Sequence, residues 1–195
     1  MHSKSDKTYG FKLFEKRISV GYIRAKSYFL VYEEVGKSKF VEEYMETKMY
    51  DFKRIGIDEI ETIKELFTSV FTIEPWNDDW SNQEQLDLYL NDLVGQSNSL
   101  TYGLYEDENL IGVSMEHIKH WYSGTEYCID ELCIKTDKQG NGIGTHFLKE
   151  IEKGIKEIGL VQIFLQTEKT VPAYGFYQKN GFYELKEHVS FGKQI

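Results

Sequence analysis

The stretch that decides the fold is Gln139-Gly140-Asn141-Gly142-Ile143-Gly144, a glycine-rich loop between two segments of different periodicity. Before it, residues 127–135 read as a β-strand. After it, apolar side chains recur at steps of three and four residues, which predicts an amphipathic helix over residues 143–158. Glycine tolerates a positive φ, and the free N–H groups of a first helical turn favour negative charge. The loop therefore indicates a phosphate site.

Glycine alone does not establish such a site, because an ordinary strand-to-helix turn uses it for the same backbone reason. The spacing does exclude two nucleotide-binding loops. The sequence has no Gly-x-Gly-x-x-Gly, and no Gly-Lys-Ser/Thr closes the loop. The interpretation of the loop therefore depends on the sequence at its two sides.

With its flanks, the loop resembles the acyl-CoA pyrophosphate loop of the GNAT superfamily of N-acetyltransferases. The pattern Gln-x-x-Gly-x-Gly follows residues 131–134 (ELCI), which are similar to that family's fourth strand. Residues 173–182 (AYGFYQKNGF) are similar to its last helix and the turn after it. The resemblance covers about Met49 to the C-terminus. It implies an α/β fold whose fourth and fifth strands splay apart to admit the pantetheine arm.

Length and charge narrow the class of protein. The chain has 195 residues, 41% of them hydrophobic and 15% aromatic, which suits one globular domain with an extension. A formal charge of −9 disfavours nucleic acid as a partner and favours a cationic substrate. The apolar runs are too short to span a membrane, and residues 1–10 lack the apolar core of a secretory signal. We therefore expect a cytoplasmic protein with two free cysteines.

The predicted domains are an N-terminal extension over residues 1–48 and a GNAT acetyltransferase domain over residues 49–195. In the extension, residues 11–14 and 28–32 are β-rich, and residues 38–48 are consistent with a helix. The second domain is expected to hold a mixed, mostly antiparallel sheet of about six to seven strands, with flanking helices and splayed central strands.

Within that domain, strands and helices are predicted in the order that the GNAT resemblance implies. The expected strands cover residues 49–55, 100–105, 110–121, 125–134, 160–167 and 182–191. The expected helix starts are an N-cap at Asp58, an N-cap at Ser81, the glycine loop, and a first-turn Pro172.

The resemblance also implies how acetyl-CoA binds. Backbone N–H groups of the loop would hold the pyrophosphate, and the open edge of the preceding strand would bond the pantetheine amides. The cofactor-binding candidates are Leu132, Cys133, Ile134, Gln139, Gly140, Asn141, Gly142, Ile143, Gly144 and Thr145. Tyr177 stands where many GNAT enzymes have a tyrosine that donates to the departing sulfur. The alternative for Tyr177 is a core aromatic.

A substrate ammonium must lose a proton before it attacks a thioester, so a carboxylate in the cleft is expected. Asp130 and Glu131 are the catalytic candidates, in a segment that resembles the corresponding strand of aminoglycoside N-acetyltransferases. Neighbours on a strand point to opposite faces, so we expect only one of them in the cleft, with Glu131 preferred. The resemblance aligns this strand through a bulge that shifts the register by one residue, so Asp130 is the alternative. If neither acts, Glu116 and His117 are next. The histidines have no spacing typical of a metal site, and we expect no metal.

Residues 74–80 (EPWNDDW) lie between the first two predicted helices, where the GNAT fold places much of its acceptor site. Carboxylates attract an ammonium group and indole faces stack on it. The substrate-binding candidates are Trp76, Asp78, Asp79 and Trp80. The segment is similar to the Pro-Trp-Asn stretch of aminoglycoside-modifying-like GNAT proteins. An ordered helix-to-helix turn with buried tryptophans is the alternative.

Together these features predict an acetyl-CoA-dependent N-acetyltransferase that acts on the primary amine of an aminoglycoside or polyamine. The partner would be a small amine, and the chain could form a homodimer. A protein amine is the second candidate acceptor. A non-catalytic acyl-CoA-binding module is the alternative from another class.

Overall fold

The computed structural model of the chain describes residues 24–30, 40–46 and 50–195. The chain divides into two compact units, residues 1–49 and Tyr50–Ile195. In the first unit, β1 (Arg24–Leu30) pairs antiparallel with β2 (Phe40–Glu46). The helix expected over residues 38–48 is therefore wrong, since pairing with β1 overrides a weak helical preference. The β-rich patch at residues 11–14 lies outside the described residues.

The second unit is built on a five-stranded sheet in the order β3-β4-β5-β6-β7. Strands β3 to β6 are antiparallel neighbours, and β7 runs parallel to β6. This confirms the mixed, mostly antiparallel sheet. The strands are β3 (Tyr50–Ile55), β4 (Thr101–Glu106), β5 (Asn109–Trp121), β6 (Gly124–Ile134) and β7 (Gln162–Leu165).

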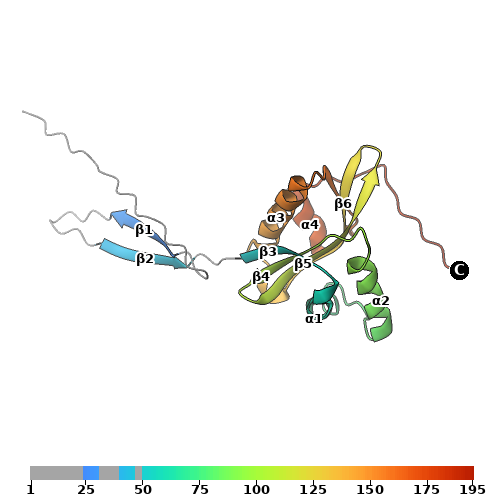
Figure 1. The fold of residues 1–195 in the computed structure, drawn as a ribbon, viewed down its shortest axis with the longest axis horizontal. Coiled ribbons are helices and arrows are strands. Elements are labelled where there is room, and N and C mark those ends of the chain that lie inside the picture. Colours follow the sequence, from blue (N-terminus) through green and yellow to red (C-terminus); the bar gives the residue numbers. More distant parts are fainter. Residues whose placement is uncertain (1–23, 31–39, 47–49) are drawn as a thin grey trace, which may run out of the picture. The chain divides into compact units, whose positions relative to one another are not determined.

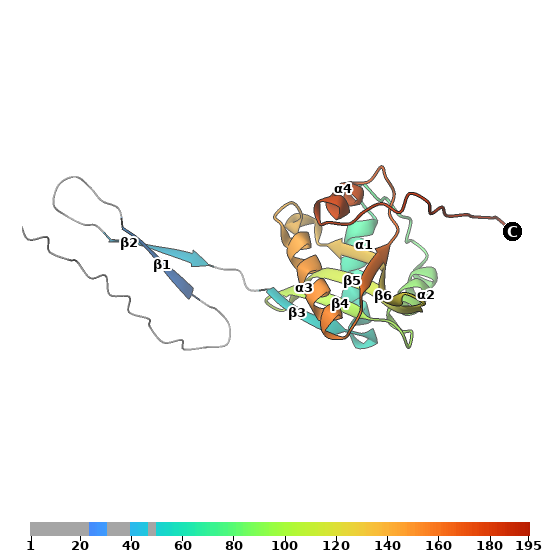
Figure 2. The ribbon, with the colours of Figure 1, turned by 90° about the horizontal axis from the view of Figure 1, so that it is seen from above.

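Helices cover both faces of this sheet (Figures 1 and 2). On one face lie the short 3-10 helix η1 (Ile57–Glu59), α1 (Ile60–Phe71) and α2 (Gln83–Val94). On the other lie α3 (Ile143–Glu157) and α4 (Pro172–Lys179). The 3-10 helix η2 (Thr136–Lys138) joins β6 to the loop before α3. The described part of the chain contains no helix long and apolar enough to cross a membrane.

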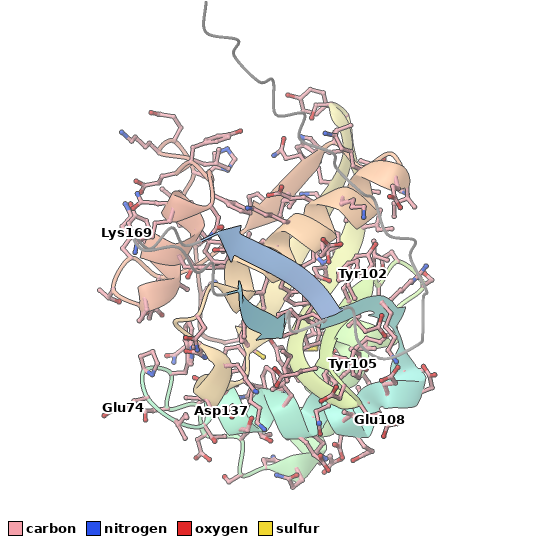
Figure 3. The ribbon with its side chains drawn as sticks, turned by 90° about the vertical axis from the view of Figure 1, so that its left-hand side faces the viewer. Glu74, Tyr102, Tyr105, Glu108, Asp137 and Lys169 are labelled. Carbon is pink, nitrogen blue, oxygen red and sulfur yellow. The ribbon has the colours of Figure 1, made fainter. Side chains whose placement is uncertain are left out.

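The apolar stripe of α3 is buried through Ile143, Phe147, Leu148, Ile151 and Ile155, whereas Ile158 at the predicted end of the helix is its C-cap and is exposed. These side chains pack on the β-sheet in one core cluster, and α1 and α2 form a second cluster on the opposite face. The side chains of β4 alternate between the two clusters, as Tyr102 and Tyr105 in Figure 3 illustrate. The sheet is therefore covered on both faces by helices, and β6 lies between β5 and β7 in it.

Two predicted helix starts are displaced. Asp58 is not an N-cap, because it lies inside η1, whose N-cap is Gly56, and α1 follows from Glu59. The N-cap of α2 is Asn82 rather than Ser81, and its Oδ1 accepts a hydrogen bond from Gln85 N at 3.1 Å. Asparagine caps a helix as well as serine does, so the pattern alone cannot choose between neighbours.

The final strand predicted over residues 182–191 does not form, so the sheet has five strands rather than six or seven. Gly181 ends the α4 turn with φ +88°, and the chain turns again where His188 N bonds Leu185 O. Side-chain contacts hold the segment instead: Lys169 (labelled in Figure 3) pairs with Glu184, and Gln166 bonds Ser190 at 2.8 Å. A groove of about 720 Å³ runs between this segment, β7, α3 and α4.

Candidate active site

The glycine loop presents an open, uncapped helix start. Gly140 and Gly142 have φ of +77° and +79°, and no atom lies within 4 Å of a Cβ built on either residue. Gly142 is the N-cap of α3 and makes no side-chain cap hydrogen bond. The N–H groups of the first turn therefore face a space that an anion can occupy. These residues fit the pyrophosphate of a coenzyme A.

The polar side chains of the loop shape its backbone. Gln139 Nε2 donates to Ile134 O at 2.7 Å, and Asn141 Nδ2 donates to Gln139 O at 3.2 Å. Gly144 lets α3 approach α4, because a Cβ at this position would lie 3.1 Å from the Phe176 ring. The loop thus offers backbone groups, as the resemblance implies.

Strands β6 and β7 separate next to this loop. Their pairing runs from Glu126 opposite Gln162 to Ile129 opposite Leu165, and it stops there. Residues 132–134 pair with β5 on one side, and among the described residues no strand pairs with their other side. The predicted splay is therefore confirmed. The free edge has the backbone donors and acceptors that an extended amide chain requires.

A β-bulge in β6 changes the direction of the acidic side chains. Met115 lies opposite Glu131 and Glu116 lies opposite Ile129, so Asp130 is an extra residue without a partner on β5. An extra residue resets the alternation of a strand. Asp130 and Glu131 consequently both project toward the α2 side of the sheet. The expectation that they point to opposite faces is wrong.

Glu131 is held against α2 by Tyr89. The Tyr89 hydroxyl donates to Glu131 Oε1 at 2.6 Å. Burial raises the pKa of Glu131 to about 7, the Tyr89 hydrogen bond opposes this, and Asp78 and Asp130 add to the rise. A carboxyl with a pKa near 7 is partly ionised at neutral pH and can accept a proton from a substrate.

Asp130 is paired with a histidine on the neighbouring strand. Asp130 Oδ2 lies 2.7 Å from His117 Nδ1. The side chains are 35% and 39% exposed, so solvent and small molecules reach both.

The loop between α1 and α2 supplies one wall of the same region. Trp80 stacks on Tyr89 with ring centroids 5.0 Å apart, and Trp76 packs on Phe71 at 5.5 Å. Both indoles are partly buried against the core. Asp79 accepts a hydrogen bond from Ser81, which lowers the pKa of Asp79. Asp78 lies near enough to act on the pKa values of Glu131 and Tyr89.

An acidic groove of about 500 Å³ adjoins this loop. Its lining includes four carboxylates, from Glu61 and Glu65 on α1 and from Asp78 and Asp79 on the loop. The single lysine of that lining, Lys64, is bonded to Asp87. Negative charge is therefore in excess in the groove beside the loop between α1 and α2.

Tyr177 lies on α4, half-buried beside Phe176 and Phe182. Burial raises the pKa of Tyr177 well above its usual value, and the charges of Glu116 and Glu131 act in the same direction. The hydroxyl therefore keeps its proton at neutral pH and can serve as a hydrogen-bond donor.

Sequence reasoning missed Tyr89, whose position on α2 fits the apolar stripe of that helix. It anticipated a bulge in this strand but ranked His117 behind the carboxylates, and it did not pair His117 with Asp130. A tyrosine in an apolar stripe is a weak signal of a polar partner, since a buried Tyr O–H usually finds one.

Comparison with known structures shows the same fold in other proteins. The fold is similar to a possible acetyltransferase from Clostridium difficile 630, with 14% identity, a TM-score of 0.64, and coverage of 75% of this chain and 98% of that chain. It is also similar to an aminoglycoside acetyltransferase from an uncultured soil metagenomic sample in complex with sisomicin. That comparison has 19% identity, a TM-score of 0.59, and coverage of 75% of this chain and 96% of that chain. A third similar structure is the aminoglycoside N-acetyltransferase AAC(6')-Iy in complex with CoA. It has 12% identity, a TM-score of 0.60, and coverage of 75% of this chain and 96% of that chain.

A search of the curated proteins finds no sequence match. Residues 60–182 match the acetyltransferase (GNAT) family. This range contains α1, α2, the strands β4 to β7, the glycine loop and α4. Because the match covers more than half of the chain, the protein belongs to the GNAT acetyltransferase family and is an acetyl-CoA-dependent acyltransferase.

Proposed function

We propose that the protein is an N-acetyltransferase whose acceptor is the primary amine of a small cationic molecule, of the aminoglycoside or polyamine class. The observation that carries this proposal is the group of proton-accepting side chains at the β6 bulge, which lies directly before the open edge of β6. A protein amine is the second candidate acceptor. A cytoplasmic location and a homodimer stay predictions from the sequence.

The residues that would hold acetyl-CoA are the loop from Gln139 to Thr145 and the free edge from Leu132 to Ile134. Bound there, acetyl-CoA supplies the acetyl group and a thiolate leaving group. The Tyr177 hydroxyl keeps its proton, whereas the Tyr89 hydroxyl already donates to Glu131, so we assign Tyr177 the hydrogen bond to the departing sulfur.

The side chains at the bulge would receive the acceptor. An alkyl ammonium has a pKa near 10, so only a small fraction of it is the free amine at neutral pH. Glu131, with a pKa of about 7, and Asp130 are suited to attract the ammonium and take part in its deprotonation. Trp76 and Trp80 would shape the wall of the acceptor site.

Charge supports a cationic acceptor. The groove beside Asp78 and Asp79 is lined by an excess of carboxylates, and the whole chain has a formal charge of −9. Opposite charge raises the local concentration and the association rate of a cation. The soil metagenomic relative was solved with sisomicin, an aminoglycoside, which makes this class the first to test.

The proposal is tested by the release of free thiol from acetyl-CoA in the presence of single amines. Sisomicin, spermidine and a lysine-containing peptide represent the three acceptor classes. Turnover with sisomicin or spermidine at a kcat/KM well above that of the peptide supports the proposal. Preference for the peptide favours a protein acceptor. CoA binding without turnover of any amine favours the non-catalytic module.

Tyr177→Phe is expected to lower kcat about 10- to 100-fold while leaving acetyl-CoA affinity nearly unchanged. The lost hydrogen bond matters most as negative charge develops on the sulfur, so the ground state is little affected. Steady-state kinetics and calorimetric titration with CoA measure the two quantities. Equal kcat in the variant and the wild type would return Tyr177 to a packing role.

Asp78→Asn is expected to raise KM for a cationic acceptor several-fold with little change in kcat, which is the pattern of lost uniform binding. The variant should also show a weaker dependence of kcat/KM on salt, because one attracting charge is gone. Asp92→Asn, at an exposed position on α2, is the matched control for loss of one negative charge. If both variants behave alike, Asp78 has no specific part in acceptor binding.

A further inference from the structure

We infer that His117 is the group that takes the proton from the acceptor amine, and that Asp130 positions its imidazole. This inference rests on the proposed N-acetyltransferase function and assigns the proton transfer within that site. It gives Glu131, which accepts the Tyr89 hydrogen bond at Oε1, the task of attracting the ammonium.

The hydrogen bond between the two side chains selects the histidine tautomer. Asp130 Oδ2 lies 2.7 Å from His117 Nδ1. An ionised carboxylate can only accept, so Nδ1 carries the proton and the lone pair of the neutral ring is at Nε2. The part of the chain that the structure describes offers Nε2 no hydrogen-bond partner. A carboxylate that fixes the tautomer of a base in this way is known from hydrolase triads.

The β-bulge in β6 brings the side chains of His117 and Asp130 together. His117 lies opposite Cys128 on β6, and the extra residue turns Asp130 back over the same face. Met115, two residues before His117, is the partner of Glu131. His117 therefore stands one step along the face from Glu131, and its side chain is 39% exposed. The register therefore places Nε2 and the Glu131 carboxyl on the same face of the sheet, two residues apart along β5.

The other ionisable groups around the pair leave His117 as the accessible base. Glu131 and Tyr89 are bonded to each other, and Asp78 lies on the loop that packs beside them. Lys119, further along β5, lies over the Trp121 ring. Glu131 and Asp78 are thus suited to hold the ammonium, while Nε2 has a lone pair that no described residue uses.

The transfer of the acetyl group to the acceptor amine needs only acetyl-CoA, the amine and water. One proton of the acceptor ammonium moves to Nε2, and the freed nitrogen lone pair forms the C–N bond. The nitrogen then loses its second proton to water as the amide forms. The C–S bond of the thioester breaks with its electron pair on sulfur. The thiolate leaves with the hydrogen bond of Tyr177 and takes up a proton from water, and the imidazolium then returns its proton to water.

The test compares His117→Gln, Asp130→Asn and the control His120→Gln, whose histidine bonds Thr125 instead. Thiol release is followed from pH 5.5 to 10 with sisomicin and with spermidine. His117→Gln is expected to lower kcat/KM about 100-fold at pH 7, and less as the pH approaches 10 and the amine loses its proton unaided. Asp130→Asn should lower it as well, because the imidazole is then free to take the other tautomer. His120→Gln should match the wild type.

A second readout needs no turnover. In the full-length protein with ¹⁵N-labelled histidine, NMR is expected to show His117 protonated at Nδ1 at pH 8, and a mixture of tautomers in Asp130→Asn. Wild-type turnover together with an unchanged pH profile in His117→Gln overturns the inference and leaves the proposed function intact. No turnover by the wild type overturns the proposed function. A proton at Nε2 in the wild type overturns the inference by itself.

Discussion

Gly142→Val is expected to abolish the rise in melting temperature that CoA gives to the wild-type protein. Gly142 has φ +79°, a region that costs a branched side chain about 1–3 kcal/mol. The new side chain also occupies the open space before the first turn of α3, where the pyrophosphate would lie. A ligand at 100 times its Kd stabilises the folded state by about 2.7 kcal/mol, so the loss is easily measured by thermal denaturation.

Gly159→Val is the matched control for backbone strain. Gly159 also has a positive φ, +84°, and a Cβ there would meet nothing within 4 Å. It lies beyond the other end of α3 from the loop. Both variants should be less stable than the wild type, and only Gly142→Val should lose the response to CoA. A normal CoA response in Gly142→Val would show that the glycine loop is not the pyrophosphate site.

The local sequence pattern was enough to predict those parts of the fold where a sequence signal is compatible with only one local structure. The three- and four-residue steps of α3 allow one buried face, and the structure buries it. Pro172 starts α4 at the position where its missing N–H does no harm. Gly140 and Gly142 of the loop take the positive φ that glycine allows.

The errors arose where tertiary pairing decides between similar local choices. The bulge at Asp130 depends on the register between β5 and β6, and nothing in the sequence of β6 alone marks the extra residue. The same bulge reverses the predicted facing of Asp130 and Glu131 and brings His117 into the site. The final segment failed as a strand for a related reason, since its apolar residues Tyr183, Val189 and Phe191 remain exposed.

One feature of the core opposes stability. Glu116 is 0% exposed, on the α3 side of the sheet, and neither of its carboxyl oxygens has a hydrogen-bond partner within the described residues. Ser114 and Tyr127, both fully buried nearby, have unpartnered hydroxyls as well. Tyr127 lies near enough to lower the pKa of Glu116 slightly, yet its hydroxyl does not reach hydrogen-bonding geometry. Burial dominates and raises the pKa of Glu116 well above 4.5.

Glu116→Met is therefore expected to increase the free energy of unfolding at neutral pH by about 1–3 kcal/mol, the usual cost of a buried polar group without a partner. The gain should depend on pH in a defined direction. Because the folded pKa of Glu116 lies above the unfolded value near 4.5, the folded state keeps the proton longer. The contribution of Glu116 to wild-type stability is then greatest below pH 4.5 and is lost as the pH rises through the folded pKa. Urea denaturation from pH 4 to pH 8 measures both effects.

Glu116→Gln separates the charge from the polarity of the side chain. It cannot ionise, so it should remove the Glu116 contribution to the pH slope, and it still buries an amide, so it should gain less stability than Glu116→Met. A methionine variant that is less stable than the wild type at pH 8 would contradict this account. It would mean that the carboxyl has partners, such as buried water bridging to Ser114 and Tyr127. The measured order of the three proteins thus decides whether Glu116 weakens the core or anchors a hydrated polar cluster beneath α3.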